Sequence, residues 1–231
     1  MAKKKQTRAK EPVGKKTKVL LVDDHPIVRN GLRMLIQHQP DLAVCGEAED
    51  APEALEIVES KMPDMVVIDL SLKNTSGLDL VKDIKGRYPK IRMLVLSVHD
   101  ESIYAERVLR AGAAGYIMKK EVATKVVAAI RRVLTGEIYL SEEMSSRMVH
   151  MFIGGRSEAS GHPIKSLTDR ELEVFQLIGR GFKTGEVAKS LKVSVSTVEY
   201  HRAHIKEKLQ LNDASELMRY AVQWMNGQGA T

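Results

Sequence analysis

Between residues 18 and 135, five short apolar runs alternate with stretches of helical spacing. The apolar runs occupy residues 19–22, 42–46, 65–68, 93–96 and 115–118. Each run is bounded by turn-forming or charged residues, which is typical of strands buried on both faces. Strands that alternate with helices form βαβ units around a parallel sheet. We therefore expect an α/β domain over residues 18–138, with a doubly wound, five-stranded parallel sheet.

The chain changes character after residue 138. Residues 139–164 are predicted to be a linker, because Gly, Ser and Pro gather near its end, and residues 141–152 can form one short helix. From residue 165 to 231 the apolar spacing is helical throughout, starting with a capping box at Thr168 and Glu171. The sequence predicts a small all-α domain of four helices here.

The positive charge is concentrated at one end of the chain. The net charge is +6, and residues 1–18 hold eight basic residues against one acidic residue. We predict that residues 1–17 form a disordered basic tail, either simply solvated or weakly attracted to phosphates. No apolar run approaches the roughly 20 residues of a membrane helix. The single cysteine, Cys45, excludes an internal disulfide and fits a reducing compartment, so we expect a cytoplasmic protein.

Acidic residues follow two of the predicted strands. Asp23 and Asp24 come directly after the first strand and Asp69 after the third, and ligands bind at this edge of open parallel sheets. Converging carboxylates repel one another, and Mg²⁺ relieves this repulsion. One such carboxylate can attack a phosphoryl group. Ser97 and Lys119, after the fourth and fifth strands, can then contact phosphate oxygens. We interpret His25 as a loop residue.

Four segments, 20–26, 66–70, 96–97 and 111–119, together resemble the receiver domain of bacterial response regulators. The resemblance implies a flavodoxin-like sheet of order 2-1-3-4-5 and phosphorylation of Asp69 by a histidine kinase. The Mg²⁺ ligands that it implies are Asp23, Asp24, Asp69 and the backbone carbonyl of Ser71. It makes Ser97 the switch hydroxyl, Tyr116 an aromatic that turns inward on phosphorylation, and Lys119 the phosphate-binding lysine.

The helix predicted to end near Leu209 has two unlike sides. Val198, Ile205 and Leu209 share one side, and Glu199, Tyr200 and Ala203 share the other. Such a polar side is commonly just solvated. The wider pattern over residues 165–227 resembles the LuxR-type helix-turn-helix domain of NarL/FixJ response regulators, whose third helix enters the DNA major groove. The resulting candidate DNA contacts are Thr184, Ser194, Ser196, Thr197, Glu199, Tyr200, Arg202, Ala203, His204, Lys206 and Lys208.

Taken together, the two resemblances predict a transcription regulator that is not an enzyme beyond its own phosphorylation. Phosphorylation of Asp69 is expected to promote a homodimer that binds two DNA half-sites. In one alternative, the first domain is a dimerisation module that does not depend on phosphorylation. In another, the chain is a phosphohydrolase with an aspartate nucleophile. Such hydrolases carry a second acid two residues after the nucleophile, where this chain has Ser71.

Overall fold

A computed structural model describes residues 16–72, 75–153 and 163–228, with the backbone alone for Met151, Phe152 and Gln228. Most of the predicted basic tail and residues 154–162 of the predicted linker lie outside the described residues. The first strand, β1 (Thr17–Val22), begins at Thr17, so the predicted tail extends one residue too far.

The central sheet is parallel and has five strands, as the alternation of apolar runs predicts. They are β1, β2 (Leu42–Ala48), β3 (Met65–Asp69), β6 (Arg92–Ser97) and β7 (Gly115–Met118). Their order is β2-β1-β3-β6-β7, which is the order that the receiver resemblance implies. Strands β1, β3 and β6 have neighbours on both sides, so their apolar side chains fill the core above and below the sheet.

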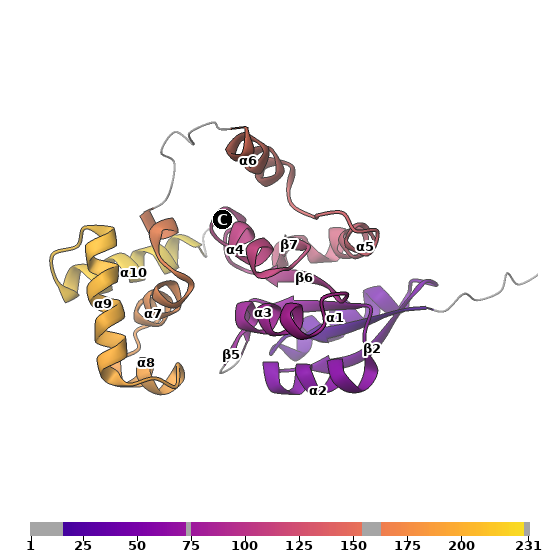
Figure 1. Cartoon of the computed structure of the whole chain (residues 1–231), viewed down its shortest axis with the longest axis horizontal. Coiled ribbons are helices and arrows are strands. Elements are labelled where there is room, and N and C mark those ends of the chain that lie inside the picture. The colour runs from indigo at the N-terminus through magenta and orange to yellow at the C-terminus, as the bar shows by residue number, and fades with distance from the viewer. Residues whose placement is uncertain (1–15, 73–74, 154–162, 229–231) are drawn as a thin grey trace, which may run out of the picture.

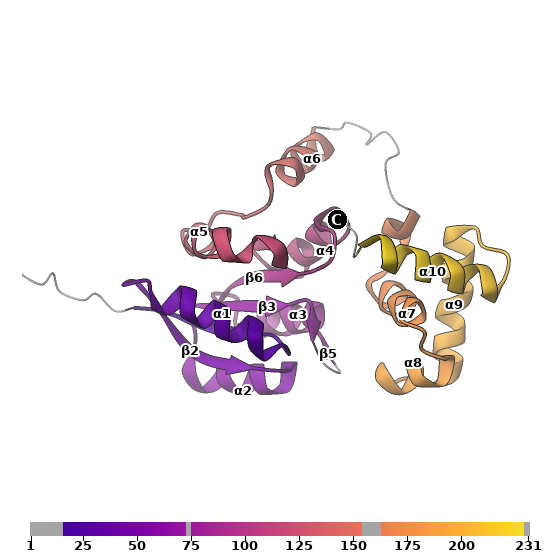
Figure 2. The same cartoon turned by 180° about the vertical axis from the view of Figure 1, so that it is seen from behind.

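Helices cover both faces of the sheet. Figure 2 shows α1 (Pro26–Gln37) and α5 (Val122–Leu134) on one face. Figure 1 shows α2 (Ala51–Lys61), α3 (Gly77–Arg87) and α4 (Glu101–Ala111) on the other. The starts of α2, α3 and α4 are fixed by side chains that accept a backbone hydrogen bond, namely Asp50, Ser76 and Asp100. None of the helices in the described part of the chain is long and apolar enough to cross a membrane.

Two small elements after β3 were not predicted. Strands β4 (Ser71–Leu72) and β5 (Thr75–Ser76) pair in antiparallel fashion beside the carboxyl end of β3. After the first domain, α6 (Glu142–Phe152) is capped by the Ser141 hydroxyl and packs on α4. The short 3-10 helix η2 (Pro163–Ser166) opens the second domain.

The second domain is helical, as predicted. It consists of η2, α7 (Asp169–Gly179), α8 (Thr184–Ser190), α9 (Val195–Leu209) and α10 (Ala214–Gln228). The predicted capping box is present, since the Thr168 hydroxyl and the Glu171 carboxylate each accept the other's backbone N–H. Phe175 of α7 packs edge-on against Trp224 of α10, with ring centroids 5.5 Å apart, and closes the core. In both views α9 lies on the side remote from the sheet (Figures 1 and 2).

Candidate functional site

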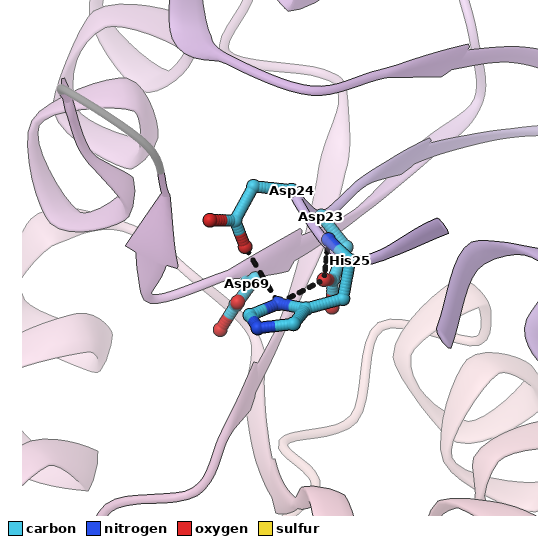
Figure 3. Close-up of side chains that lie close together, drawn as sticks. All are labelled: Asp23, Asp24, His25 and Asp69. Carbon is cyan, nitrogen blue, oxygen red and sulfur yellow. Dashed lines mark hydrogen bonds and ion pairs between the residues drawn. The ribbon is translucent and has the colours of Figure 1, made fainter. Parts of the chain in front are cut away.

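The sheet register brings three aspartates to one edge (Figure 3). Val22 of β1 pairs with Ile68 of β3, so the residues that follow them, Asp23 and Asp69, lie next to each other. One oxygen from each of Asp23, Asp24 and Asp69 and one ring nitrogen of His25 all lie within 4.8 Å of one another. Asp23 and Asp69 are almost fully buried. The structure thus assembles an acidic cluster whose charges need cations.

Lys119 supplies one of those cations. It starts the 3-10 helix η1 (Lys119–Glu121), directly after β7. Its Nζ lies 2.7 Å from Asp23 Oδ2 and 2.8 Å from Asp69 Oδ2. Burial alone would lower the pKa of Lys119, but the attraction of Asp69 and Asp23 outweighs it and raises that pKa. The ammonium group is therefore charged at neutral pH.

The Asp69 carboxyl has a raised pKa. Burial raises its pKa to about 6, although the Lys119 charge opposes the shift, and the nearby charge of Asp23 adds to it. Its Oδ1 accepts a hydrogen bond from the Ser71 N–H at 3.2 Å. Gly77 at the start of α3 approaches so closely that a Cβ there would lie 2.1 Å from the Asp69 carbonyl oxygen. A buried carboxylate whose pKa is shifted by burial and by a specific charged partner is typical of a functional group.

The donor set of this cluster fits a hard divalent cation. Three carboxylates face one lysine, so the cluster retains negative charge, and carboxylate oxygens are preferred ligands of Mg²⁺. His25 lies in the loop between β1 and α1, as interpreted from the sequence, and its ring faces the cluster (Figure 3). Its Nδ1 lies 2.7 Å from Asp24 Oδ1 and 3.2 Å from Asp23 Oδ1. His25 therefore competes with a cation for the same oxygens.

The predicted switch residues lie one and two strands away from Asp69. Ser97 ends β6, and its buried Oγ accepts the His99 N–H at 3.0 Å. Tyr116 on β7 is fully buried and donates its hydroxyl proton to the His99 carbonyl at 2.7 Å. Burial raises the pKa of Tyr116 well above its ordinary value. The Tyr116 ring is already buried in this structure, so it needs no inward turn to reach that position.

The candidate DNA contacts gather on and beside α9. Buried Val198, Ile205 and Leu209 hold the helix against its domain, as its amphipathic pattern predicts. The exposed candidates are Ser194, Ser196, Glu199, Tyr200, Ala203 and Lys208. The half-buried candidates are Thr184, Thr197, Arg202, His204 and Lys206. The Ser194 hydroxyl caps α9 and also contacts those of Ser196 and Thr197.

Two of the candidate cations have partners within the domain. Arg202 Nη1 donates to Thr184 Oγ1 at 3.1 Å, which joins α9 to the start of α8. Lys208 Nζ lies 2.6 Å from Glu171 Oε2, the carboxylate of the capping box. Burial opposes the change, but the Lys208 hydrogen bond and the Thr168 N–H hold the pKa of Glu171 below its ordinary value. Contacts of these two residues with DNA phosphates stay predictions.

The second domain contacts the first through the start of α7. Asp169 lies 2.8 Å from Lys82 Nζ of α3 and 3.0 Å from Arg107 Nη1 of α4. Arg107 also donates to the Leu167 carbonyl at 2.6 Å. Burial opposes the change, but Lys82 and Arg107 together lower the pKa of Asp169. The two domains are thus joined by a group of ionic contacts.

A second contact links this interface to the acidic cluster. Gln176 of α7 donates to the Tyr104 hydroxyl of α4, and the Tyr104 ring stacks on His99 with centroids 5.0 Å apart. A cleft of about 1050 Å³ lies between the domains, and both Asp69 and Gln176 line it. The acidic cluster therefore opens toward the second domain.

Comparison with known proteins assigns both domains. Residues 19–131 match the response regulator receiver domain family, and residues 165–221 match the bacterial regulatory proteins of the luxR family. A receiver followed by such a domain defines a two-component response regulator. The oxygen regulatory protein NreC of Staphylococcus carnosus is 36% identical over 209 residues, which is 89% of this chain and 96% of NreC. The NreC of Staphylococcus aureus is 37% identical over the same shares. The chain belongs to the response regulators of the NarL/FixJ type, with a LuxR-type DNA-binding domain.

Solved structures agree with this assignment. RcsB from Salmonella enterica serovar Typhimurium, bound to promoter P1flhDC in the presence of the phosphomimetic BeF3⁻, matches with a TM-score of 0.69 and 26% identity. The match covers 90% of this chain and 98% of that chain. A LuxR-family response regulator from Aurantimonas sp. SI85-9A1 is 34% identical, with a TM-score of 0.56, over 60% of this chain and 99% of its own. Such relatives are DNA-binding regulators rather than enzymes, and receivers typically bind Mg²⁺ at an acidic pocket of this kind.

Two residues near the site, His99 and Arg29, escaped the sequence analysis. His25 was identified as a loop residue, but its contact with the aspartates was not predicted, although its position directly after the aspartate pair was a usable signal. His99 and Arg29 offered no such signal. Packing between β7 and the segment after β6 brings His99 against Tyr116, and the fold of α1 back over the loop after β1 brings Arg29 against the Asp23 carbonyl.

Proposed function

We propose that this protein is a phosphorylation-dependent DNA-binding transcription regulator whose phosphoacceptor is Asp69. The observation that carries the proposal is the buried pair of Asp69 and Lys119, 2.8 Å apart, at the edge of the sheet beside Asp23 and Asp24. The protein is expected to act in the cytoplasm, and a cognate sensor histidine kinase is the expected phosphoryl donor.

The transfer is a displacement at phosphorus. An Asp69 carboxylate oxygen attacks the phosphorus of a phosphohistidine, a P–O bond forms and the P–N bond breaks. The electron pair of the broken bond stays on the imidazole nitrogen. Lys119 stabilises negative charge on the transferring oxygens. Asp23, Asp24, Asp69 and the Ser71 carbonyl would hold Mg²⁺, which supplies further charge neutralisation when bound.

Labelling with acetyl phosphate tests this assignment. In the presence of Mg²⁺, intact-mass spectrometry should detect one added phosphoryl group on the wild-type chain and none on Asp69→Asn. Asp24→Asn should label slowly and recover when more Mg²⁺ is added, because it acts through metal affinity. Full labelling of Asp69→Asn would contradict the proposal.

Coupling to the second domain follows the contacts around His99. A phosphoryl group brings about −1.5 to −2 charges and strong acceptor oxygens. The Ser97 hydroxyl, which now accepts the His99 N–H, can turn to donate to such an oxygen. His99 then loses a bond that fixes its loop, and its ring stacks on Tyr104, the partner of Gln176. This route moves the loop rather than the Tyr116 ring.

Movement of this loop is expected to loosen the contact between Tyr104 and Gln176 and to free the second domain. We expect the freed domains of two copies to bind DNA together. Two phosphorylated copies that dimerise present two α9 helices to two half-sites, so tethering raises the effective concentration of the second helix. Sedimentation and operator titration with and without acetyl phosphate should show that dimer population and DNA affinity rise together. Ser97→Ala should keep Asp69 labelling but reduce both gains. Equal dimerisation and binding without phosphorylation would instead indicate a receiver that serves as a constitutive dimerisation module.

A further inference from the structure

A buried guanidinium group lies beneath the acidic cluster. Arg29 belongs to the first turns of α1, and its side chain is only 11% exposed. Its Nη1 donates to the backbone carbonyl of Asp23, and its Nη2 lies 2.8 Å from Glu49 Oε1. Its Nε lies 3.6 Å from Glu47 Oε2. One side chain thus joins α1, the end of β2 and the loop that carries the aspartates.

The carbonyl that Arg29 contacts belongs to the peptide unit between Asp23 and Asp24. The N–H of Asp23 is held by the Ala48 carbonyl at 3.1 Å, so the main chain of this residue is fixed on both sides. In extended chain, neighbouring side chains point in opposite directions. Both carboxylates nevertheless reach one cluster, and the chain bends at Asp24, directly after this peptide unit. Whatever fixes the peptide unit also fixes the separation of the two carboxylates.

We propose that Arg29 is a positioning residue for the divalent cation, because it fixes the peptide unit that joins Asp23 and Asp24. This inference rests on the proposed function, in which the acidic cluster binds Mg²⁺. An arginine suits the task since its planar fork donates to a carbonyl and to carboxylates at once, whereas a lysine presents one point charge. The two glutamates neutralise the guanidinium and hold it in place.

The alternative role is purely structural. An ion pair between α1 and β2 would need Glu47 and Glu49 but not the carbonyl of Asp23. The two roles differ in what happens to metal affinity. Loss of a partner that orients a ligand typically lowers metal affinity by 10–100-fold. Loss of an ion pair between two elements lowers stability and leaves metal affinity unchanged.

The experiment titrates Mg²⁺ by calorimetry into the full chain and into four variants, Arg29→Lys, Arg131→Lys, Glu49→Gln and Asp24→Asn. Arg29→Lys should bind Mg²⁺ about tenfold more weakly than wild type. Its labelling rate with acetyl phosphate should reach the wild-type plateau at high Mg²⁺, since the reacting groups are intact. Arg131→Lys is the matched control, because it weakens the pair between Arg131 of α5 and Asp41, which lies just before β2 and away from the cluster. It should bind Mg²⁺ like wild type.

Glu49→Gln keeps the inference falsifiable if Arg29→Lys does not fold. This variant removes the ion pair but leaves the Asp23 carbonyl contact, so Mg²⁺ affinity should stay within about twofold of wild type. The inference would be overturned if Glu49→Gln lost as much Mg²⁺ affinity as Asp24→Asn does. It would also be overturned if folded Arg29→Lys bound Mg²⁺ with wild-type affinity. If wild type and Asp24→Asn bind Mg²⁺ equally weakly, the proposed metal site itself fails, which is a distinguishable result.

Discussion

The acidic cluster and the outer surface of α9 are built in opposite ways. The cluster collects buried side chains from the ends of three strands, so its charges act at short range in a poorly solvated place. The α9 surface is a single helix whose polar side chains meet solvent, where charges are screened. One substitution in the cluster should therefore cause a large change in the phosphorylation rate. One substitution on α9 should cause only a modest change in DNA affinity.

Removal of the lysine from the cluster should have the largest effect. Lys119→Met leaves Asp23 and Asp69 without the cation that both contact, so labelling by acetyl phosphate should fall about 100-fold or more. Lys206→Met on α9 is the control and should label at the wild-type rate. Similar losses in both variants would remove the contrast between the two regions.

The raised pKa of Asp69 makes stability depend on pH. Its carboxyl has a pKa of about 6 in the folded protein against an ordinary value of 3.8. Ionisation of this carboxyl therefore lowers the free energy of unfolding. That penalty is absent below pH 4, grows between pH 4 and 6, and reaches about 3 kcal/mol above pH 6. Denaturant unfolding of the receiver in EDTA should thus show Asp69→Asn more stable than wild type. The gain should be larger at pH 7.5 than at pH 5. A gain that is independent of pH would contradict the buried charge.

The exposed surface of α9 should respond more gently. Tyr200 is 60% exposed, and Tyr200→Ala should lower operator affinity by about tenfold through the loss of one contact in the groove. Phosphorylation should be unchanged. Titration of operator and of unrelated DNA separates base recognition from general attraction. If Tyr200→Ala lowers the affinity for operator and for unrelated DNA equally, Tyr200 does not contribute to sequence-specific recognition.

The smallest effect is expected at the contact between the domains. Asp169→Asn weakens the ionic contacts with Lys82 and Arg107, and partly exposed pairs contribute about 1 kcal/mol or less. Hydrogen exchange of α4 and α7 amides should accelerate a few-fold. Asp79→Asn is the matched control, since Asp79 also pairs with Lys82 but within the receiver. If both variants exchange alike, Asp169 does not hold the domains together.

The sequence predicts the elements of this molecule better than their long-range contacts. Buried strands such as β7 are bounded as expected, because a continuous apolar run between turn residues leaves little choice. The β4–β5 pair was missed, since two-residue strands carry no periodic signal. The partner of Lys208 was missed for a different reason. Glu171 is 37 residues away, and its capping role gave no hint that it also faces α9.

In the candidate site, too, the residues at strand ends could be predicted from the sequence, whereas their long-range contacts could not. Strand-end aspartates were visible because parallel strands deliver their carboxyl ends to one edge. The contacts that tune them were not visible, since Arg29, His99 and Gln176 depend on how helices pack. Nothing in the apolar spacing of α4 distinguishes Tyr104, which contacts the second domain, from an ordinary core residue.

The acidic cluster spans the receiver from Asp23 to Lys119, so its parts meet only after β1, β3 and β7 have all joined the sheet. A nascent or damaged receiver lacking β7 would present aspartates without the lysine between them. On the proposed function, phosphoryl transfer at this edge therefore requires a receiver that has finished folding. A copy in which β7 has not joined the sheet is then expected to remain unphosphorylated.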